Sequence, residues 1–332
     1  MGVPIKIAGI GFYVPETVIT NDDLAKIVDT SDEWIKTRTG IERRHLVSGN
    51  ETALDMGIEA AKKAIDKAGI SPEDIDYIIA AACLGTHIYP STACEIQNAL
   101  GADKAVCFDI TAACAGLIYG MGISKAFMDS GMAKNVLIVA TEALSHCLDW
   151  NDRATCVLFG DGAGAMVLTP AEDGVNDILS IDLRAQGSLG HYIQMEAPGK
   201  NCSLVEPNDE GQMYIKMNGR EVYKYVVTKL PPHIEECVEK SGMKMDEIDY
   251  LVPHQANLRI IEALEKRLNF KHEGVISNIQ EYANTSAASI PIAIVESVQK
   301  GTMKLPCSAI LTGFGAGMTA GTAVVRLREG IA

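Results

Sequence analysis

The chain is poor in aromatic residues (5%), and although it has nine cysteines it lacks any Cys-x-x-Cys pair. An odd number of cysteines among mostly apolar neighbours argues against a disulfide scaffold or a zinc ribbon, and we expect no metal. No stretch of about 18 residues is both apolar and free of charge, and the N-terminus lacks the pattern of a secretion signal. The sequence therefore predicts a reducing, cytoplasmic compartment and no membrane partner.

Positive charge is also scarce. The 332 residues include 29 Lys and Arg against 43 Asp and Glu, which gives a formal net charge of −14. Such a chain repels nucleic acid and anionic lipid at long range, so neither is an expected partner. A partner that carries phosphate must instead meet a local basic patch. Apolar residues, by contrast, make up 47% of the chain, which is enough for a large buried core.

Cys114 is the most informative residue. It stands in a run of small residues, Asp109-Ile-Thr-Ala-Ala-Cys-Ala-Gly116, after a strand-like apolar stretch (105–108) and before a helix-like one (117–128). A cysteine at such a strand-to-helix turn faces the positive end of the helix dipole. We therefore expect the pKa of the Cys114 thiol to be lowered and the thiolate to act as a nucleophile.

Two later segments offer the groups that such a thiolate needs. His254 follows the apolar run 250–252, so it is expected at the carboxyl end of a strand, where open α/β sheets place their chemistry. Asn284 precedes another helical pattern and offers an amide N–H donor. Cysteine, histidine and asparagine together indicate covalent acyl chemistry, although a Cys-His-Asn hydrolase uses the same residue types.

The chain also contains an internal repeat. Residues 66–79 are matched by residues 239–252, at an offset of 173; in both, a helix pattern ends at Lys-x-Gly and an acidic turn leads to Ile-Asp-Tyr and an apolar strand. Two further matches follow in the same order: Thr-Ala-Ala-Cys114 with Ser-Ala-Ala-Ser289, and Phe159-Gly-Asp-Gly-Ala-Gly164 with Phe314-Gly-Ala-Gly-Met318. Three ordered matches indicate a duplicated unit.

Each repeat alternates strand-like apolar runs with helical patterns, which is typical of α/β folds with parallel sheets covered by helices. Turn-forming residues interrupt the pattern at 170–176. We therefore predict an N-terminal half, residues 1–172, that carries the cysteine, and a C-terminal half, residues 173–332, that carries the histidine and the asparagine. The three side chains are expected to converge between the halves.

These features resemble the β-ketoacyl-[acyl carrier protein] synthases III of the thiolase superfamily over essentially the whole chain. Six segments carry the resemblance: Asp32-Glu-Trp-Ile-Lys-Thr-Arg-Thr-Gly-Ile41, Ala112 to Gly116, Phe159-Gly-Asp-Gly-Ala-Gly164, Val252-Pro-His-Gln-Ala-Asn-Leu-Arg-Ile260, Asn284-Thr-Ser-Ala-Ala-Ser289 and Gly313-Phe-Gly-Ala-Gly317. The resemblance implies a duplicated, five-layered αβαβα thiolase-like fold and a homodimer.

The resemblance also implies a reaction. The chain is expected to condense a short-chain acyl-coenzyme A primer with malonyl-[acyl carrier protein] and so to initiate fatty-acid synthesis, releasing carbon dioxide and coenzyme A. Cys114 would carry the acyl group, while His254 and Asn284 would stabilise the enolate that forms on decarboxylation. No metal or redox cofactor is expected, since acyl-coenzyme A is a substrate.

The surrounding site follows from the same resemblance. The backbone N–H groups of Cys114 and Ala316 are expected to bind the oxyanion. The other expected residues are, for coenzyme A, Trp34, Arg38, Arg153 and Asn257; for the acyl pocket, Tyr89 and Phe314; and for docking the acidic carrier protein, Lys224, Arg259, Lys266 and Arg267. Relatives carry a glycine and a tryptophan where this chain has Ala316 and Ala320. Tyr89 is expected to close the partner subunit's pocket and to favour short primers.

Two alternative functions stay open. The first is a specialised acyltransferase or condensing enzyme of secondary metabolism; the intact His254 and Asn284 favour decarboxylative condensation over it. The second is a Cys-His-Asn thioester hydrolase, which the internal repeat argues against. The glycine-rich segments 160–164 and 313–317 lack a dinucleotide-binding fingerprint, so we expect them to serve close backbone packing.

Overall fold

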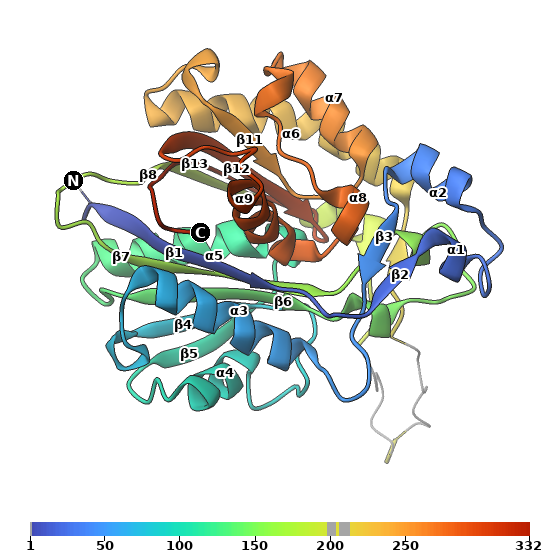
Figure 1. Ribbon diagram of the computed structural model, residues 1–332, viewed down its shortest axis with the longest axis horizontal. Coiled ribbons are helices and arrows are strands. Elements are labelled where there is room, and N and C mark those ends of the chain that lie inside the picture. Colours follow the sequence, from blue (N-terminus) through green and yellow to red (C-terminus); the bar gives the residue numbers. More distant parts are fainter. Residues whose placement is uncertain (1, 198–203, 206–212) are drawn as a thin grey trace.

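The computed structural model describes residues 2–197, 204–205 and 213–332. Two β-sheets are stacked between three layers of helices, in the order α, β, α, β, α (Figure 1). The predicted five-layered fold is therefore confirmed. Within the described residues, no helix combines the length and the apolar character that a membrane crossing requires.

The first sheet has the strand order β1-β7-β6-β4-β5. β4 pairs in parallel with β5 and β6, whereas β7 runs antiparallel between β6 and β1. Every residue of β6 is buried, as expected for a central strand that helices cover on both faces. The strands are β1 (Ile5–Tyr13), β4 (Tyr77–Ala81), β5 (Val106–Ile110), β6 (Val136–Glu142) and β7 (Gly162–Pro170).

The second sheet repeats this topology in the order β11-β12-β13-β8. β12 pairs in parallel with β11, and β13 runs antiparallel between β12 and β8. These pairings are those of β4, β6, β7 and β1, so the duplication that the sequence predicts is present in the strand order. The strands are β8 (Ile178–Ala185), β11 (Tyr250–Pro253), β12 (Cys307–Gly315) and β13 (Thr319–Leu327).

Three pairs of helices cover the sheets. α3 (Ala53–Ala68) and α4 (Thr92–Leu100) pack on the outer face of the first sheet, and α6 (Gly219–Ser241), with α7 (Leu258–Leu268) packed on it, covers the second. α5 (Gly116–Asp129) and α9 (Ser289–Gln299) contact both sheets and form the middle layer (Figure 1). Because these two helices are enclosed on both sides, α9 is buried from Ser289 to Ser297.

The longest sequence match corresponds to the same helix, turn and strand in both repeats. α3 is followed by Gly69, with φ of 67°, and leads into β4; α6 is followed by Gly242, with φ of 77°, and leads into β11. Both glycines adopt the left-handed conformation that commonly ends helices. The Lys-x-Gly signal in the sequence therefore marked two real helix ends.

The structure corrects the second match by two residues. Short 3₁₀ turns, η2 (Ala113–Ala115) and η8 (Ser286–Ala288), precede α5 and α9. Each opens with a residue of positive φ, Ala113 at 46° and Ser286 at 53°, and these two stand 173 positions apart, which is the offset of the longest match. Ala287, rather than Ser289, therefore occupies the place of Cys114 in the second repeat.

Apolar side chains form three large clusters: one under the outer helices of each sheet, and one around the middle helices between the two sheets. The middle cluster joins Leu117 and Ile118 of α5 with Ile290 and Ile294 of α9. Residues 171–177 connect the last strand of the first sheet to the first strand of the second. The boundary between residues 172 and 173 stays a prediction, which this connection supports.

Smaller elements gather at one end of the sheets. β2 (Val18–Thr20) and β3 (Arg43–His45) form a two-stranded sheet with α1 (Asn21–Leu24) beside it, and β9 (Ile193–Gln194) pairs with β10 (Lys216–Met217). α2 (Asp32–Thr39) packs on α7, and α8 (Ile279–Tyr282) packs on β3 (Figure 1).

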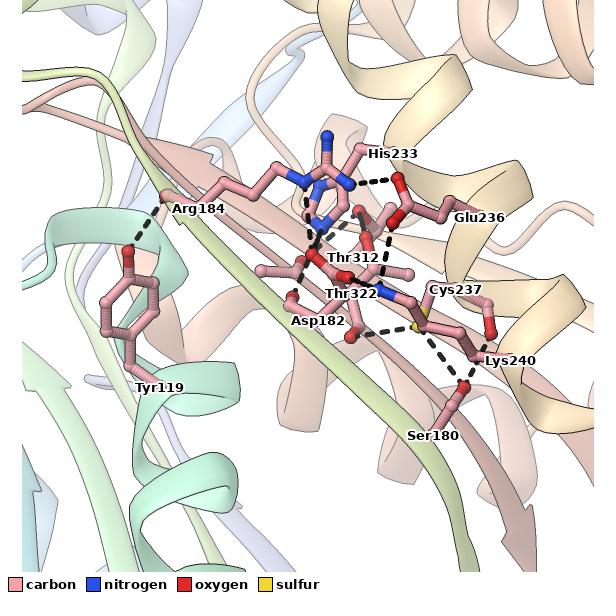
Figure 2. A network of polar contacts seen from close by, with 11 residues as sticks. Tyr119, Ser180, Asp182, Arg184, His233, Glu236, Cys237, Lys240, Thr312 and Thr322 are labelled. Atoms are coloured by element: carbon pink, nitrogen blue, oxygen red, sulfur yellow. Dashed lines mark hydrogen bonds and ion pairs between the residues drawn. The ribbon is translucent and has the colours of Figure 1, made fainter.

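A polar network fastens α6 to the second sheet (Figure 2). Asp182 of β8 pairs with His233 at 2.9 Å, with Arg184 at 3.1 Å and with Lys240 of α6. Burial opposes ionisation of Asp182, but hydrogen bonds from Lys240 and Arg184 outweigh it and lower the pKa of this carboxyl. Burial lowers the pKa of His233, so the imidazole is neutral near pH 7. The network holds α6 in place over the sheet.

Candidate active site

One cavity of about 440 Å³ brings the predicted catalytic trio together. Cys114 lies in the turn before α5, His254 follows β11, and Asn284 precedes η8, so the three come from different elements of both repeats. Apolar side chains make up most of the remaining wall, among them Leu144, Leu158, Ile193, Ile215, Met217, Val222 and Phe314. The site is thus an apolar cavity with a few polar groups at its floor, the usual form of a small-molecule site.

The end of β12 passes directly against the nucleophile turn. A Cβ atom at Gly315 would lie 2.6 Å from the backbone N of Cys114, and one at Gly313 would lie 2.8 Å from its carbonyl oxygen. Both positions therefore require glycine, which explains the glycine-rich segment as close backbone packing. The Thr319 hydroxyl, which donates to the carbonyls of Ala112 (2.9 Å) and Ala316 (3.0 Å), ties the same two segments together.

The expected lowering of the Cys114 pKa is wrong for this structure. Burial raises the pKa of the thiol to about 12; a hydrogen bond with Ser286 opposes the rise, and the nearby Glu142 carboxyl adds to it. The dipole of α5 acts only on its first turn, and desolvation of the sulfur outweighs it. Cys114 is therefore a protonated thiol near pH 7 and needs a proton acceptor before it can attack.

His254 is fixed from three sides. Its backbone N–H donates to the Thr312 carbonyl at 2.7 Å, its ring Nδ1 lies 2.7 Å from the Ser289 hydroxyl, and the ring packs edge-to-face on Phe314 at 5.4 Å between centroids. Burial lowers its pKa to about 3, so the imidazole is neutral near pH 7. Ser289 engages Nδ1, and the Ser286 backbone lies near enough to the ring to oppose the lowering of its pKa.

Asn284 is held by its backbone and by its own side chain. Its N–H donates to the Leu158 carbonyl and its carbonyl accepts from the Gly160 N–H, both at 3.0 Å. The Ser286 N–H donates to Oδ1 at 2.9 Å. Since this bond identifies the oxygen end of the amide, Nδ2 is the end that remains for a ligand, and it is a donor.

The residues expected to bind coenzyme A form one group that reaches the cavity. Arg38 and Asn257 line it, and the Asn257 side chain donates to the Arg38 carbonyl at 3.1 Å. The guanidinium carbons of Arg38 and Arg153 lie 4.5 Å and 5.3 Å from the centre of the Trp34 ring, both within cation–π distance. Arg153 also pairs with Asp29 at 3.3 Å.

The remaining expected residues divide into two groups. Phe314, Ala316 and Arg259 line the cavity. Arg259 also donates to the Thr37 carbonyl at 2.8 Å, so it fastens α7 to α2, a contact that the predicted docking role did not include. The others lie outside the cavity lining and are exposed: Tyr89, Lys224, Lys266 and Arg267.

Four residues near the floor escaped the sequence analysis as site residues: Cys83, Glu142, Ser286 and Ser289. The two serines stand in the motif that contains Asn284, three positions apart, which is one helical turn. Glu142 is the last residue of β6, so its place at the carboxyl end of a strand was the available signal. In the described residues, no group of three or more His, Cys, Asp or Glu side chains is placed to hold a metal ion.

Sequence comparisons agree on one family. Two family models match the chain. The model of 3-oxoacyl-[acyl-carrier-protein] synthase III matches residues 108–187, and the model of the C-terminal part of the same enzyme matches residues 238–327. The β-ketoacyl-[acyl-carrier-protein] synthase III of Clostridium perfringens is 45% identical over 322 residues, covering 97% of this chain and 99% of the relative. That of Aquifex aeolicus is 47% identical over 321 residues, with the same coverage of 97% and 99%.

Solved structures agree with the sequence matches. The crystal structure of the Aquifex aeolicus 3-oxoacyl-[acyl-carrier-protein] synthase III superimposes with a TM-score of 0.89 at 46% identity, covering 98% of this chain and 100% of that one. The priming β-ketosynthase of a polyketide biosynthetic pathway gives 0.92 at 32% identity, covering 98% and 97%. The family that the six sequence segments indicate is confirmed: this chain belongs to the β-ketoacyl-[acyl-carrier-protein] synthases III.

Proposed function

We propose that this chain condenses an acyl-coenzyme A primer with malonyl-[acyl carrier protein], giving 3-oxoacyl-[acyl carrier protein], carbon dioxide and coenzyme A, the step that starts fatty-acid synthesis. One observation carries the proposal: Cys114, His254 and Asn284 line a single apolar cavity in a member of this family. No cofactor takes part, because the thioester supplies the activated acyl group. The cytoplasmic location stays a prediction from the cysteine content.

In the first half-reaction, the Cys114 sulfur attacks the thioester carbonyl of the primer. A sulfur–carbon bond forms, the bond to coenzyme A breaks, and coenzyme A leaves as a thiolate. The backbone N–H groups of Cys114 and Ala316 are the proposed donors to the oxyanion. The Thr319 hydroxyl supports this role, since it holds both segments at a fixed spacing.

In the second half-reaction, His254 Nε2 and Asn284 Nδ2 donate to the thioester oxygen of the malonyl group. Negative charge grows on that oxygen as carbon dioxide leaves, and a buried pair of donors stabilises it most at that point. The carbanion then attacks the acyl carbon, a carbon–carbon bond forms, and the Cys114 thiolate is released. A neutral His254 suits this role, because its ring must donate rather than accept a proton.

Coenzyme A is proposed to lie against Trp34, Arg38, Arg153 and Asn257. An indole with two guanidinium groups at 4.5 Å and 5.3 Å offers both a flat stacking surface and positive charge. Adenine and phosphate need those two properties. Arg38 and Cys114 line the same cavity, which supports a path for the pantetheine arm from the Trp34 ring toward Cys114.

A panel of acyl-coenzyme A thioesters tests the nucleophile. Intact-protein mass spectrometry should show one acyl group added to the wild type, mapped to Cys114, and the preferred thioester identifies the primer. Cys114→Ala should show no adduct, whereas Cys307→Ala, which changes a cysteine outside the cavity lining, should load normally. An adduct on Cys83 in place of Cys114, or no adduct from any thioester, contradicts the proposal. Release of the free acid in place of an adduct favours the alternative function as a Cys-His-Asn thioester hydrolase.

Asn284→Asp tests whether Asn284 acts in the decarboxylation half-reaction and not in the loading of Cys114. A carboxylate cannot donate to the enolate oxygen, so decarboxylation of malonyl-[acyl carrier protein] should fall by about 10²- to 10³-fold. Loading of Cys114 should stay within a few fold of wild type. Carbon dioxide release and acyl loading are measured separately, with Asn98→Asp, an exposed site on α4, as control. Equal loss of both steps would mean that Asn284 does not act in the second half-reaction alone.

Carrier-protein docking is proposed on the exposed basic residues of α6 and α7: Lys224, Arg259, Lys266 and Arg267. The net charge of −14 makes such a patch necessary for an acidic partner. Arg259 is a poor test, since its bond to Thr37 also holds α7. Lys266 and Arg267, in the last turn of α7, report on docking without touching the cavity lining.

Lys266→Glu with Arg267→Glu should raise the KM for malonyl-[acyl carrier protein] about 3- to 10-fold at low salt, because rim charges steer association. The effect should shrink as salt screens the charges, and acyl-coenzyme A loading should not change. Lys62→Glu, on α3 at the opposite outer layer, is the control. An unchanged KM at low salt would place docking elsewhere.

A homodimer is proposed through the free edge of the first sheet. β5 is an edge strand of that sheet, and Ile88, Tyr89 and Val106 are 86%, 85% and 51% exposed. Apolar side chains beside an unpaired strand edge are typical of a surface that another chain covers. By this proposal, Tyr89 closes the partner subunit's acyl pocket and keeps primers short.

Val106→Asp should weaken the dimer by about 10²-fold or more, since an unpaired carboxylate would be buried in the interface. Sedimentation velocity measures it, and Val175→Asp, an exposed loop residue, is the control. A wild type that is monomeric at micromolar concentration, or a dimer that tolerates the charge, would remove this interface and with it the role of Tyr89.

A second function has the same fold. A priming ketosynthase of polyketide synthesis superimposes with a TM-score of 0.92 at 32% identity, so a specialised condensing enzyme that passes its product to another acceptor is the alternative proposal. The chemistry at Cys114, His254 and Asn284 would be the same, so the two readings differ in the carrier protein. Ala316 lines the cavity, whereas Ala320 lies in the core cluster under α6, and neither residue separates the two functions.

A further inference from the structure

Glu142 is a buried carboxyl group that the proposed reaction does not use. It ends β6, is 1% exposed and lies beneath the cavity floor. Its Oε1 accepts hydrogen bonds from the backbone N–H of Cys83 at 3.1 Å and from the Ser286 hydroxyl at 3.3 Å. No N–H or O–H group among the described residues donates to its Oε2, and the Cys83 thiol is the side chain beside the carboxyl. A buried carboxyl with so few hydrogen-bond donors is unusual.

Ser286 connects this carboxyl to the nucleophile. Its hydroxyl donates to Glu142 at 3.3 Å, and it lies near enough to the Cys114 sulfur to lower the pKa of that thiol. The turns η2 and η8 contact each other, and Ser286 is held by the bond of its N–H to Asn284 Oδ1 at 2.9 Å. A hydroxyl can accept from the thiol while it donates to the carboxylate, so the three groups form a continuous path from sulfur to Oε1.

We propose that Glu142 takes up the Cys114 thiol proton through Ser286 during acyl transfer. The inference rests on the proposed function, since it concerns the same first half-reaction. It assigns Ser286, which touches the reacting sulfur, as a proton relay, and Glu142 as a positioning residue that acts through it.

The thiol proton and the electron pair of the broken bond can be followed through both half-reactions. As the sulfur–carbon bond forms, the thiol proton passes to Ser286 Oγ, and the Ser286 proton passes to the Glu142 carboxylate, which becomes neutral. The electron pair of the broken bond leaves with coenzyme A as its thiolate, which takes a proton from water. When the carbanion later displaces Cys114 as a thiolate, Glu142 returns the proton along the same path and the free enzyme is restored.

The electrostatics of the cavity favour this route over one through the histidine. Burial raises the pKa of the thiol to about 12 and lowers that of His254 to about 3, so His254 is a poor base near neutral pH. Burial raises the pKa of Glu142 to about 7, against the opposing hydrogen bonds from Cys83 and Ser286. A proton acceptor works best when its pKa lies near the working pH.

Among the described residues, the titratable groups found to interact with Glu142 carry no positive charge. They are the thiols of Cys83 beyond β4, Cys114 in η2 and Cys147 in η3 (Leu144–Cys147), together with the Asp161 carboxyl just before β7. The carboxylate of Asp161 disfavours ionisation of Glu142. The pH range in which Glu142 accepts a proton therefore depends on burial and on this neighbour.

A purely structural role makes the opposite prediction. Glu142 also raises the pKa of Cys114 by charge repulsion, so a neutral residue at 142 should ease thiolate formation. If Glu142 only satisfied the Cys83 N–H, Glu142→Gln would then load acyl groups as fast as the wild type or faster. If Glu142 accepts the proton, the same variant should load more slowly.

The test is the pH dependence of a single acylation of Cys114, followed by rapid quench and intact-protein mass spectrometry with the preferred acyl-coenzyme A. The wild-type rate should rise with pH through an apparent pKa near 7. Glu142→Gln keeps an oxygen for Ser286 and Cys83, and should load about 10²-fold more slowly at pH 7, losing this rise. The rate should recover at high pH, where hydroxide removes the thiol proton.

Ser286→Ala provides a second way to interrupt the path while the carboxyl stays in place. It should slow loading to a similar degree, and the double variant should be no slower than the single ones, because the residues act as one unit. Glu296→Gln removes another buried carboxyl, on α9, and should load like the wild type with an unchanged pH profile.

Each outcome decides one question. Equal rates at pH 7 for the wild type and Glu142→Gln, or parallel pH profiles, would overturn the relay. Additive losses in the double variant would also overturn it, since they mean separate roles. A wild type that never loads Cys114 would instead refute the proposed function, and that result is read from the wild type alone.

Discussion

The contact between the end of β12 and the turn that carries Cys114 is the constraint on which the site depends. β12 belongs to the second sheet and the turn leads into α5 of the middle layer, so this contact sets how closely the two repeats approach. Any Cβ at Gly313 or Gly315 would lie under 3 Å from the Cys114 backbone. A side chain there would push the turn away from His254 and Phe314, because those residues are fixed to the same sheet. The glycines therefore position the nucleophile rather than bind a nucleotide.

Desolvation follows from that close packing and sets the protonation states. Burial raises the pKa of Cys114 to about 12, lowers that of His254 to about 3 and raises that of Glu142 to about 7, so in every case it favours the neutral form. A neutral His254 is the right donor for an enolate oxygen. A neutral thiol, however, is a weak nucleophile. The same burial that prepares the second half-reaction therefore creates the need for a proton acceptor in the first.

Much of the fold was readable from the sequence because its signals are local. The Lys-x-Gly ends of α3 and α6 and the apolar strands after them depend only on neighbouring residues. The ends of β5 and β11 bring Cys114 and His254 to one place by topology, and Asn284 joins them from the turn between α8 and η8. The direction of the Cys114 pKa was not readable, since the dipole is local whereas desolvation depends on every layer packed around the sulfur. The bond of Arg259 to Thr37 and the position of Ser286 beside Glu142 depend on contacts between segments far apart in the chain. No local pattern encodes such contacts.

The duplication accounts for the bridging contact itself. Ala113 and Ser286 open equivalent turns, 173 residues apart, with positive φ values of 46° and 53°, and these two turns contact each other between the repeats. A duplicated unit that packs face to face places equivalent elements side by side. In the first repeat the turn carries the sulfur; in the second, alanine stands at the equivalent position 287 and a serine hydroxyl stands one residue before it. The two equivalent turns thus carry a nucleophile on one side of the contact and a polar partner for it on the other.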